Sequence, residues 1–334
     1  MNPIKSTTVE TNGIRMHLLE AGSGPLVVLL HGFPELGYSW RHQLTAIAAA
    51  GYRVVAPDQR GYGRTDRPAA IEAYTLCHLA GDAVGLVQAL GEKQAAVFGH
   101  DWGSAVAWTS ALLRPDLFPV VGLLSVPYLA DLWAGPPPTS LMEQLRAGGM
   151  MLYQLYFQEP GPADRDLARD ARDSILRLFA GSGGGIAPQQ QWRFLYPASE
   201  AFLDHLPKVD RLPSWLSEEE LEYFGCEFAR TGFTGGLNWY RNMDRDRELL
   251  AFLAGARIQQ PSVFLAGEED LVIQMYRRDF DILEQTMPGL TAKSLIAGAG
   301  HWVQQEKAEE VNQHLLGFLA KAYPSPFGRI GDCS

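Results

Sequence analysis

Residues 97–103 read VFGHDWG, a run in which Asp101 stands midway between two glycines. The apolar residues 95–98 predict a short buried strand, and residues 105–113 predict a helix. A small residue two positions to either side of a central side chain is the spacing of a nucleophile elbow, a sharp strand-to-helix turn. Such a turn is strained and closely packed, and it lifts its central side chain above the sheet. The run therefore predicts that Asp101 presents a carboxylate nucleophile.

An aspartate as nucleophile limits the reactions that the site could catalyse. A carboxylate attacks saturated carbon, and the ester that forms can afterwards be hydrolysed. A serine version of the pattern also occurs around Ser182, in the run AGSGG at residues 180–184. No strand is predicted before that run, and glycines follow where a helix should begin, so we expect a flexible loop there.

Composition excludes several classes of function. The chain has 334 residues, of which 46% are hydrophobic and 20% charged, as in soluble globular proteins. Its formal net charge of -10 argues against binding to nucleic acid or to an anionic membrane surface. No apolar run is long enough to cross a bilayer, and the polar start of the chain lacks a secretory signal. We therefore expect a cytoplasmic protein without membrane insertion; a homodimer is compatible with these features but is not predicted by them.

The cysteines point to neither disulfides nor a metal. Cys77, Cys226 and Cys333 are odd in number and far apart in the sequence. A disulfide framework or a metal site would place cysteines in pairs or at short regular spacings. We expect no metal and no organic cofactor.

Strand and helix signals alternate through most of the chain. Further strands are predicted at residues 16–19, 26–30, 53–56, 120–125, 262–266 and 291–296, and core helices at 38–50, 79–90 and 306–320. This alternation is typical of an α/β protein with a mostly parallel central sheet flanked by helices. It stops after Pro127, where proline and glycine runs and helical stretches such as 165–180 and 217–230 follow. We predict a core of residues 1–128 and 251–334, interrupted by a mainly helical cap at 129–250.

A base and an acid follow two later strands. His301 lies in the run GAGHW after the strand at 291–296, and the run GEED after residue 266 offers Glu268, Glu269 and Asp270. Parallel strands present their carboxyl ends at one edge of the sheet, so these side chains should lie near Asp101. The order nucleophile, acid, histidine is that of a catalytic triad on this kind of sheet. Any of the three acids could orient the histidine.

The strand that ends at Leu30 is followed by His31, Gly32, Phe33 and Pro34. A loop at this position donates one backbone N–H to an oxyanion hole, and the residue after the nucleophile donates the other. We assign these two donors to Phe33 and Trp102. His31, Gly32 and Pro34 are expected to shape the loop, and His100, beside the nucleophile, is expected only to pack.

These motifs resemble those of epoxide hydrolases with the α/β-hydrolase fold, both soluble bacterial enzymes and the C-terminal domain of the mammalian enzyme. The resemblance covers nearly the whole chain and includes HGFPE at 31–35, DQRGYG at 58–63 and GHW at 300–302. Its most specific parts are YQLYFQEPG at 153–161 and LNWYRN at 237–242. It implies that Asp270 is the triad acid. It also implies that Tyr153 and Tyr240 hang from the cap and hydrogen-bond the epoxide oxygen.

The resemblance implies detoxification chemistry in which a small-molecule epoxide and water give a vicinal diol. Asp101 would form a hydroxyalkyl ester, and His301 with Asp270 would activate water to hydrolyse it. The apolar pocket for such a substrate is expected to include Trp40 and Trp239, with Trp102, Trp192 and Phe194 as further candidates. Two alternatives remain open: a haloalkane dehalogenase using the same Asp-His-Asp triad, and a non-catalytic binding or signalling protein on this fold.

Overall fold

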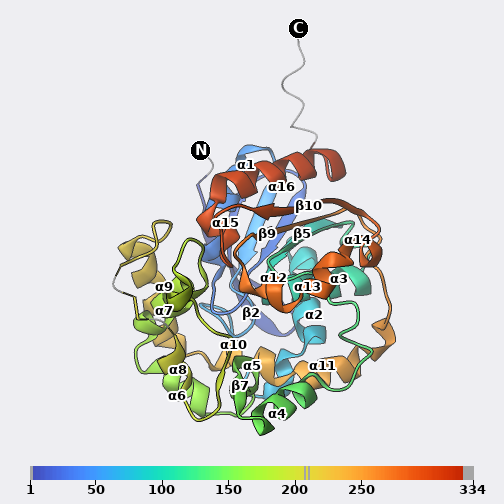
Figure 1. Ribbon diagram of the computed structural model, residues 1–334. Helices are drawn as coiled ribbons and strands as arrows, with labels where there is room; N and C mark the ends of the chain where they lie inside the picture. Colours follow the sequence, from blue (N-terminus) through green and yellow to red (C-terminus); the bar gives the residue numbers. More distant parts are fainter. Residues whose placement is uncertain (1–2, 207, 210, 326–334) are drawn as a thin grey trace.

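The computed structural model describes residues 3–206, 208–209 and 211–325. An eight-stranded sheet, in the order β1-β2-β4-β3-β5-β6-β9-β10, forms the centre of the molecule (Figure 1). Its strands are β1 (Lys5–Thr11), β2 (Ile14–Gly22), β3 (Leu26–Leu30), β4 (Arg53–Pro57), β5 (Ala95–His100), β6 (Val120–Leu124), β9 (Ser262–Gly267) and β10 (Leu290–Ile296). Cys333 and the rest of residues 326–334 lie outside the described residues.

The sheet is mixed at one edge and parallel elsewhere. β1 pairs antiparallel with β2, and β2 antiparallel with β4, whereas the pairs from β4 through β10 are parallel. Asn12 and Gly13 join the first two strands, both with positive φ (44° and 78°), as a two-residue hairpin requires. β1 was not expected, because its residues, KSTTVET, are mostly polar and form an exposed edge strand.

Helices cover both faces of the sheet, and the central parallel strands are therefore buried on both sides. One face packs against α1 (Arg41–Ala49) and α16 (Ala308–Ala322), and the other against α2 (Leu76–Ala89) and α3 (Trp102–Leu113). These two apolar layers hold the carboxyl ends of the strands in a rigid row, and that row carries the candidate site.

The segment between β6 and β9 is mainly helical. It contains α4 (Pro138–Ala147), α5 (Tyr153–Tyr156), α6 (Pro162–Ala168), α7 (Ala171–Ser182), α8 (Phe202–His205), α9 (Glu218–Thr231), α10 (Thr234–Arg241) and α11 (Met243–Leu249). A small antiparallel pair, β7 (Met150–Leu152) and β8 (Leu195–Pro197), was not expected there. Figure 1 shows this cap along the lower and left side of the molecule.

Two local expectations for the cap are wrong. The helix predicted at 165–180 is divided, because Asp170 leaves the helical conformation and its side chain caps α7 by accepting from the N–H of Asp173. The run around Ser182 is not wholly a loop, since Ser182 is the last residue of α7. Its hydroxyl donates to the carbonyl of Leu178 at 2.6 Å, and it ends a helix instead of standing on a strand-to-helix turn.

The cap is attached to the core by partly buried polar contacts and close backbone approaches. Arg41 of the core forms a 2.6 Å ion pair with Glu220 of α9. Asn242 donates to the carbonyl of Ile71 at 2.7 Å. A Cβ on Gly235 would collide with the backbone of Gly61, so only glycine permits this approach of α10.

The remaining short elements are α12 (Leu271–Met275), α13 (Arg277–Asp281), α14 (Leu283–Thr286), α15 (Val303–Glu306) and the 3₁₀ turns η1 (Gly37–Trp40), η2 (Ile71–Tyr74), η3 (Pro188–Gln190) and η4 (Ala251–Leu253). Within the described ranges, none of the helices combines the length and apolar character needed to cross a bilayer.

Candidate active site

Asp101 occupies a sharp turn between β5 and α3. Its φ of 53° and ψ of -122° are strained for a residue with a side chain and cost about 1–3 kcal/mol. The turn is possible because its neighbours are small: a Cβ on Gly99 would overlap the carbonyl oxygen of Gly103, and one on Gly32 would overlap the Asp101 carboxylate. The predicted elbow is therefore present, and its carboxylate projects from the carboxyl edge of the sheet.

His301 and Asp270 lie beside this carboxylate. The His301 Nε2 is 3.6 Å from Oδ2 of Asp101, and its Nδ1 is 3.3 Å from Oδ1 of Asp270. Asp270 is fully buried at the start of α12, where its Oδ1 also accepts from the N–H of Val272. Of the three adjacent acids, Glu268 is exposed and Glu269 accepts instead from the N–H of Gly185. Among them, only Asp270 is placed to orient the histidine.

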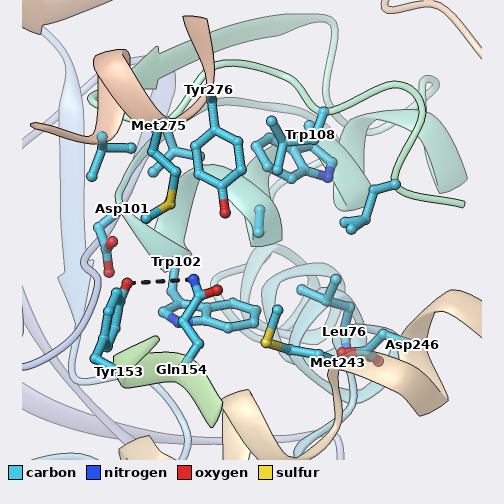
Figure 2. A pocket seen from close by; sticks show the side chains of 15 residues that line it. Leu76, Asp101, Trp102, Trp108, Tyr153, Gln154, Met243, Asp246, Met275 and Tyr276 are labelled. Atoms are coloured by element: carbon cyan, nitrogen blue, oxygen red, sulfur yellow. Dashed lines mark hydrogen bonds between the residues drawn. The ribbon is translucent and has the colours of Figure 1, made fainter. Parts of the chain in front are cut away.

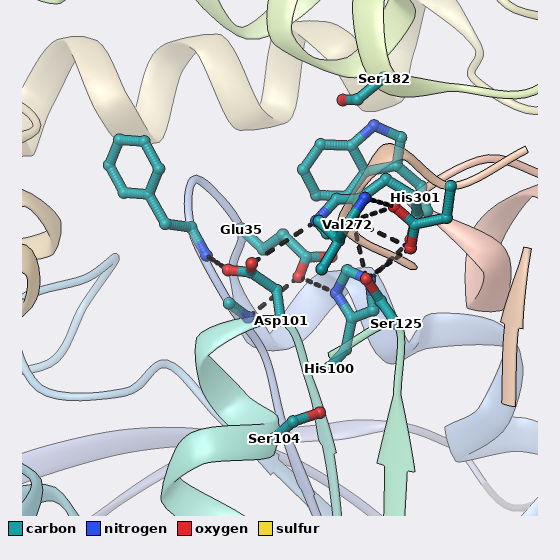
Figure 3. Close-up of polar contacts among 12 residues, drawn as sticks. Glu35, His100, Asp101, Ser104, Ser125, Ser182, Val272 and His301 are labelled. Atoms are coloured by element: carbon teal, nitrogen blue, oxygen red, sulfur yellow. Dashed lines mark hydrogen bonds and ion pairs between the residues drawn. The ribbon is translucent and has the colours of Figure 1, made fainter. Parts of the chain in front are cut away.

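Ser125, which follows β6, joins this pair. Its hydroxyl is 2.6 Å from Oδ2 of Asp270 and 2.8 Å from Nδ1 of His301, so it can donate to the acid and accept from the histidine (Figure 3). It is fully buried and has a φ of 69°, another strained position. Sequence reasoning treated it only as the end of a strand. A polar residue at the carboxyl end of a buried parallel strand was the available signal.

Electrostatics keep the pair charged. Burial alone would lower the pKa of His301, but Asp270 and Asp101 together raise it well above its usual value. Burial alone would raise the pKa of Asp270, but His301, Ser125 and the Val272 N–H lower it. Asp270 and Asp101 therefore favour the positively charged form of the His301 imidazole.

A second buried network lies beneath the triad. His100 contacts the carbonyl oxygen of His301 through Nε2 at 2.7 Å and Oε2 of Glu35 through Nδ1 at 2.6 Å (Figure 3). Glu35 also accepts from the N–H of Gly32 at 2.9 Å and from the Gln304 amide at 3.0 Å. Although burial opposes it, contact with His100 and the Gly32 N–H lowers the pKa of Glu35 to about 2. The expectation that His100 only packs is wrong: it ties the His301 loop to the Gly32 loop.

The loop after β3 brings an amide to the nucleophile. The N–H of Phe33 donates to Oδ1 of Asp101 at 2.8 Å. His31 supports the loop, contacting the Gly32 carbonyl through Nδ1 and accepting from the Gln59 N–H through Nε2. The Phe33–Pro34 peptide bond is cis. Trp102 begins α3, so its N–H has no acceptor within the helix and lies directly after the nucleophile.

Two cap tyrosines face Asp101 from above. Tyr153 and Tyr240, with ring centroids 6.0 Å apart, line a cavity of about 350 Å³ together with Asp101 and His301. Burial raises the pKa of both phenols well above the usual value, and the negative charge of Asp101 adds to the effect. Both therefore remain protonated and can donate. The Gln154 amide lies 3.4 Å from the Tyr153 hydroxyl (Figure 2).

Comparisons with known proteins identify the family of the chain. Residues 25–160 match the family described as the alpha/beta hydrolase fold. Over 317 residues the chain is 48% identical to epoxide hydrolase A of Mycobacterium tuberculosis, covering 93% of this chain and 96% of that protein. The chain belongs to the epoxide hydrolase family. A solved epoxide hydrolase from an endophytic Streptomyces superposes with a TM-score of 0.91 at 46% identity, covering 95% of each chain.

The family's wider members include mouse bifunctional epoxide hydrolase 2, which is 36% identical over 94% of this chain and 55% of its own length. The predicted membership and the predicted α/β-hydrolase fold are therefore confirmed, and the chain is an enzyme of the epoxide hydrolase family.

Two tryptophans expected in the substrate pocket lie elsewhere. Trp40 is fully buried in the apolar layer formed with α1 and α16, on a face of the sheet away from the cap. Trp239 is also fully buried, donates its indole N–H to the carbonyl of Arg60 and packs edge-on against Trp102. Of the other candidates, Trp192 and Phe194 line the cavity beside the tyrosines. Indole side chains carry no sequence signal that separates pocket from core.

A larger, mostly apolar pocket of about 690 Å³ adjoins the nucleophile. Its wall includes Asp101, Trp102 and Tyr153, together with Gln154, Tyr276 and Asp246, three polar side chains that sequence analysis did not single out. In the part of the chain that the structure describes, no group of three or more His, Cys, Asp or Glu side chains is arranged to hold a metal ion.

Proposed function

We propose that this epoxide hydrolase family member converts an epoxide and water to a vicinal diol through a hydroxyalkyl ester on Asp101. One observation carries the proposal: a carboxylate held on an elbow, 3.6 Å from His301, faces the two protonated phenols of Tyr153 and Tyr240. A nucleophile and a pair of proton donors on opposite sides of a small cavity match the two ends of an epoxide C–O bond.

In the first step, an oxygen of Asp101 bonds to a ring carbon and the C–O bond to the epoxide oxygen breaks. The electron pair stays on that oxygen, which is a poor leaving group unless it is protonated. Tyr153 and Tyr240 donate to it as charge develops, and a positioned acid of this kind typically contributes about 10²–10⁴ in rate. The ordinary phenol pKa near 10 is raised further here by burial, so both tyrosines stay protonated at neutral pH.

In the second step, His301 takes a proton from water, which attacks the carbonyl carbon of the ester. Formation of the ester removes the negative charge of Asp101, one of the two charges that raise the pKa of His301. After alkylation the imidazolium can therefore give up its proton to the tyrosinate that ring opening leaves, which restores the phenol and frees His301 to act as the base. The N–H groups of Phe33 and Trp102 would stabilise the oxyanion. As the oxyanion collapses, the bond from the carbonyl carbon to the substrate oxygen breaks, and His301 donates a proton to the departing oxygen to give the diol. The new carboxyl group of Asp101 returns a proton to His301 and becomes a carboxylate again.

A single turnover in heavy-oxygen water tests this sequence of bonds. With enzyme in excess, the first diol should carry only the epoxide oxygen and an unlabelled oxygen from Asp101. The peptide that contains Asp101 should gain the solvent isotope. Label in the first diol would mean that water opened the ring directly, and the proposal would fail.

A haloalkane dehalogenase remains the second candidate, because its chemistry also begins with attack by an aspartate on saturated carbon. Halide leaves without a proton, so paired phenols over Asp101 have no task in that reaction. We therefore expect diol from styrene oxide and no halide from 1-chlorobutane. A non-catalytic binding role would not explain the strained elbow or the placement of His301 between Asp101 and Asp270.

A further inference from the structure

The larger pocket has polar groups at both ends. Asp101 and Tyr153 lie at one end, and Asp246 lies at the other, beside Leu76 and Met243 (Figure 2). The wall between them is mainly apolar. A substrate that reaches from the nucleophile along this pocket would therefore meet a second carboxyl group at its remote end.

Asp246 is a buried acid that accepts one hydrogen bond from the protein, whereas a carboxylate can accept about four. It belongs to α11, is 3% exposed, and its Oδ1 accepts from the N–H of Leu76 at 2.7 Å. Among the described residues, none donates to its Oδ2 and none forms an ion pair with it. An unpaired polar atom in an apolar wall is costly unless a ligand or solvent satisfies it. The contact with Leu76 explains one oxygen as a tie between α11 and α2, but leaves the other without a role.

The surroundings favour the protonated acid. Burial raises the pKa of Asp246 to about 8, against the opposing effects of the Leu76 N–H and Arg245 on its own helix. Cys77 on the facing helix α2 is the titratable group that senses the charge of Asp246. At neutral pH the carboxyl therefore has an O–H to donate, whereas the phenols at the other end of the pocket are directed at the epoxide oxygen.

We propose that Asp246 determines specificity by hydrogen-bonding a hydroxyl group that the epoxide carries at the end remote from its ring. This inference rests on the proposed function, since it uses Asp101 to place the ring. A hydroxyl group fits either protonation state, because it can accept from a carboxylic acid and donate to a carboxylate. The preferred substrates are thus epoxy alcohols with a mainly apolar chain between the two oxygen functions.

Matched substrates test the inference without identifying the natural one. The probes are terminal epoxides of increasing chain length, each compared with the same epoxide carrying a hydroxyl at the far end. For the best-matched length, the unaltered protein should show a kcat/KM about threefold to tenfold higher for the hydroxyl-bearing member, the yield of one neutral hydrogen bond. A preference for the plain epoxide at every length would overturn the inference.

Variants separate recognition from structure. Asp246→Leu should abolish the preference, whereas Asp246→Asn should retain it, because the amide can accept from Leu76 and donate to the hydroxyl. Glu248→Gln, on an exposed position of the same helix, is the control and should leave the ratio unchanged. If Asp246 only ties α11 to α2, the leucine variant will lose stability but keep the ratio.

The outcomes also distinguish this inference from the proposed function. If the leucine variant does not fold, comparison of the unaltered protein with Asp246→Asn still tests the inference. Loss of the preference for hydroxyl-bearing epoxides in the asparagine variant would overturn the inference. If plain epoxides form the ester on Asp101 but no preference appears, only the role of Asp246 is wrong. If no epoxide forms that ester, the proposed function itself has failed.

Discussion

The two sides of the candidate site are built differently. Beneath the substrate cavity, Asp101, Ser125, Asp270 and His301 follow β5, β6, β9 and β10, so the backbone of one parallel sheet sets their spacing. Above it, the tyrosines lie on short cap helices and depend on side-chain packing. The sheet side is therefore suited to a nucleophile and base whose distances must not change. The cap side is suited to groups that select and polarise the substrate.

Each side of the site therefore serves mainly one half-reaction: the base on the sheet side serves hydrolysis of the ester, and the phenols on the cap side serve its formation. Substitution of the histidine on the sheet side should stop hydrolysis of the ester but still allow the ester to form. Substitution of the tyrosines on the cap side should slow formation of the ester but still allow its hydrolysis. The expected effects can be separated because the covalent intermediate is observable by mass.

The largest effect is expected from His301→Gln. The glutamine cannot act as the base for water, so multiple turnover should fall by about 10⁴-fold or more, as for removal of other catalytic histidines. Intact-protein mass spectrometry should then show a stable adduct with the mass of the epoxide. Asp101→Asn is the control, because it lacks the nucleophile and should show no adduct. Absence of the adduct with every epoxide that the unaltered protein turns over would refute the covalent route.

Removal of the cap phenols should give the next largest effect. Tyr153→Phe and Tyr240→Phe should each slow ester formation by about 10²-fold, and the double variant by about 10⁴-fold. Rapid-quench mass measurements in single turnover report ester formation directly. Tyr156→Phe, a cap tyrosine whose hydroxyl contacts Asp166, is the matched control. Unchanged rates of ester formation in both single variants would show that the cap side does not activate the epoxide.

The sheet side was also the more predictable side. The elbow, the histidine and the loop of Phe33 follow apolar strands, and the alternation of strands with helices predicts a parallel sheet whose strands end at one edge. Selection of Asp270 among three adjacent acids required the structure or the resemblance, because charge alone does not show which carboxylate turns inward. The tyrosines came only from the resemblance, since a cap aromatic has the same local signal whether it packs or donates.

The errors have physical causes of the same kind. Trp40 and Trp239 share the apolarity of pocket residues, but three-dimensional packing places them in the core. Ser125, Glu35 and Asp246 are polar residues whose importance arises from partners more than 35 positions away in the chain. Such pairings depend on the arrangement of the cap and the loops, which short-range sequence patterns do not encode.

Glu35→Gln should test how strongly the network beneath the triad stabilises the sheet side. The folded-state pKa of Glu35 is about 2, below its ordinary value of 4.5, so its contribution is present above pH 4.5 and is lost as the pH falls toward 2. That difference corresponds to about 3 kcal/mol. Urea unfolding across this range should show a flatter acid dependence for the variant and lower stability at neutral pH. Glu248→Gln, at an exposed site, should retain the unaltered profile; an unaltered profile in Glu35→Gln would refute the role of the network.

Ser125→Ala should have the smallest effect, and the effect should be confined to the sheet side of the site. The hydroxyl lies 2.8 Å from Nδ1 of His301, closer than either oxygen of Asp270, so its loss should loosen the orientation of the ring. We expect ester hydrolysis to slow by about tenfold, the scale of one buried hydrogen bond, with ester formation nearly unchanged. Ser125→Thr retains the hydroxyl and should restore much of the rate if the branched side chain fits. Equal slowing of both steps would mean that Ser125 supports the elbow as a whole instead of the histidine, and would remove it from the list of residues that position the base.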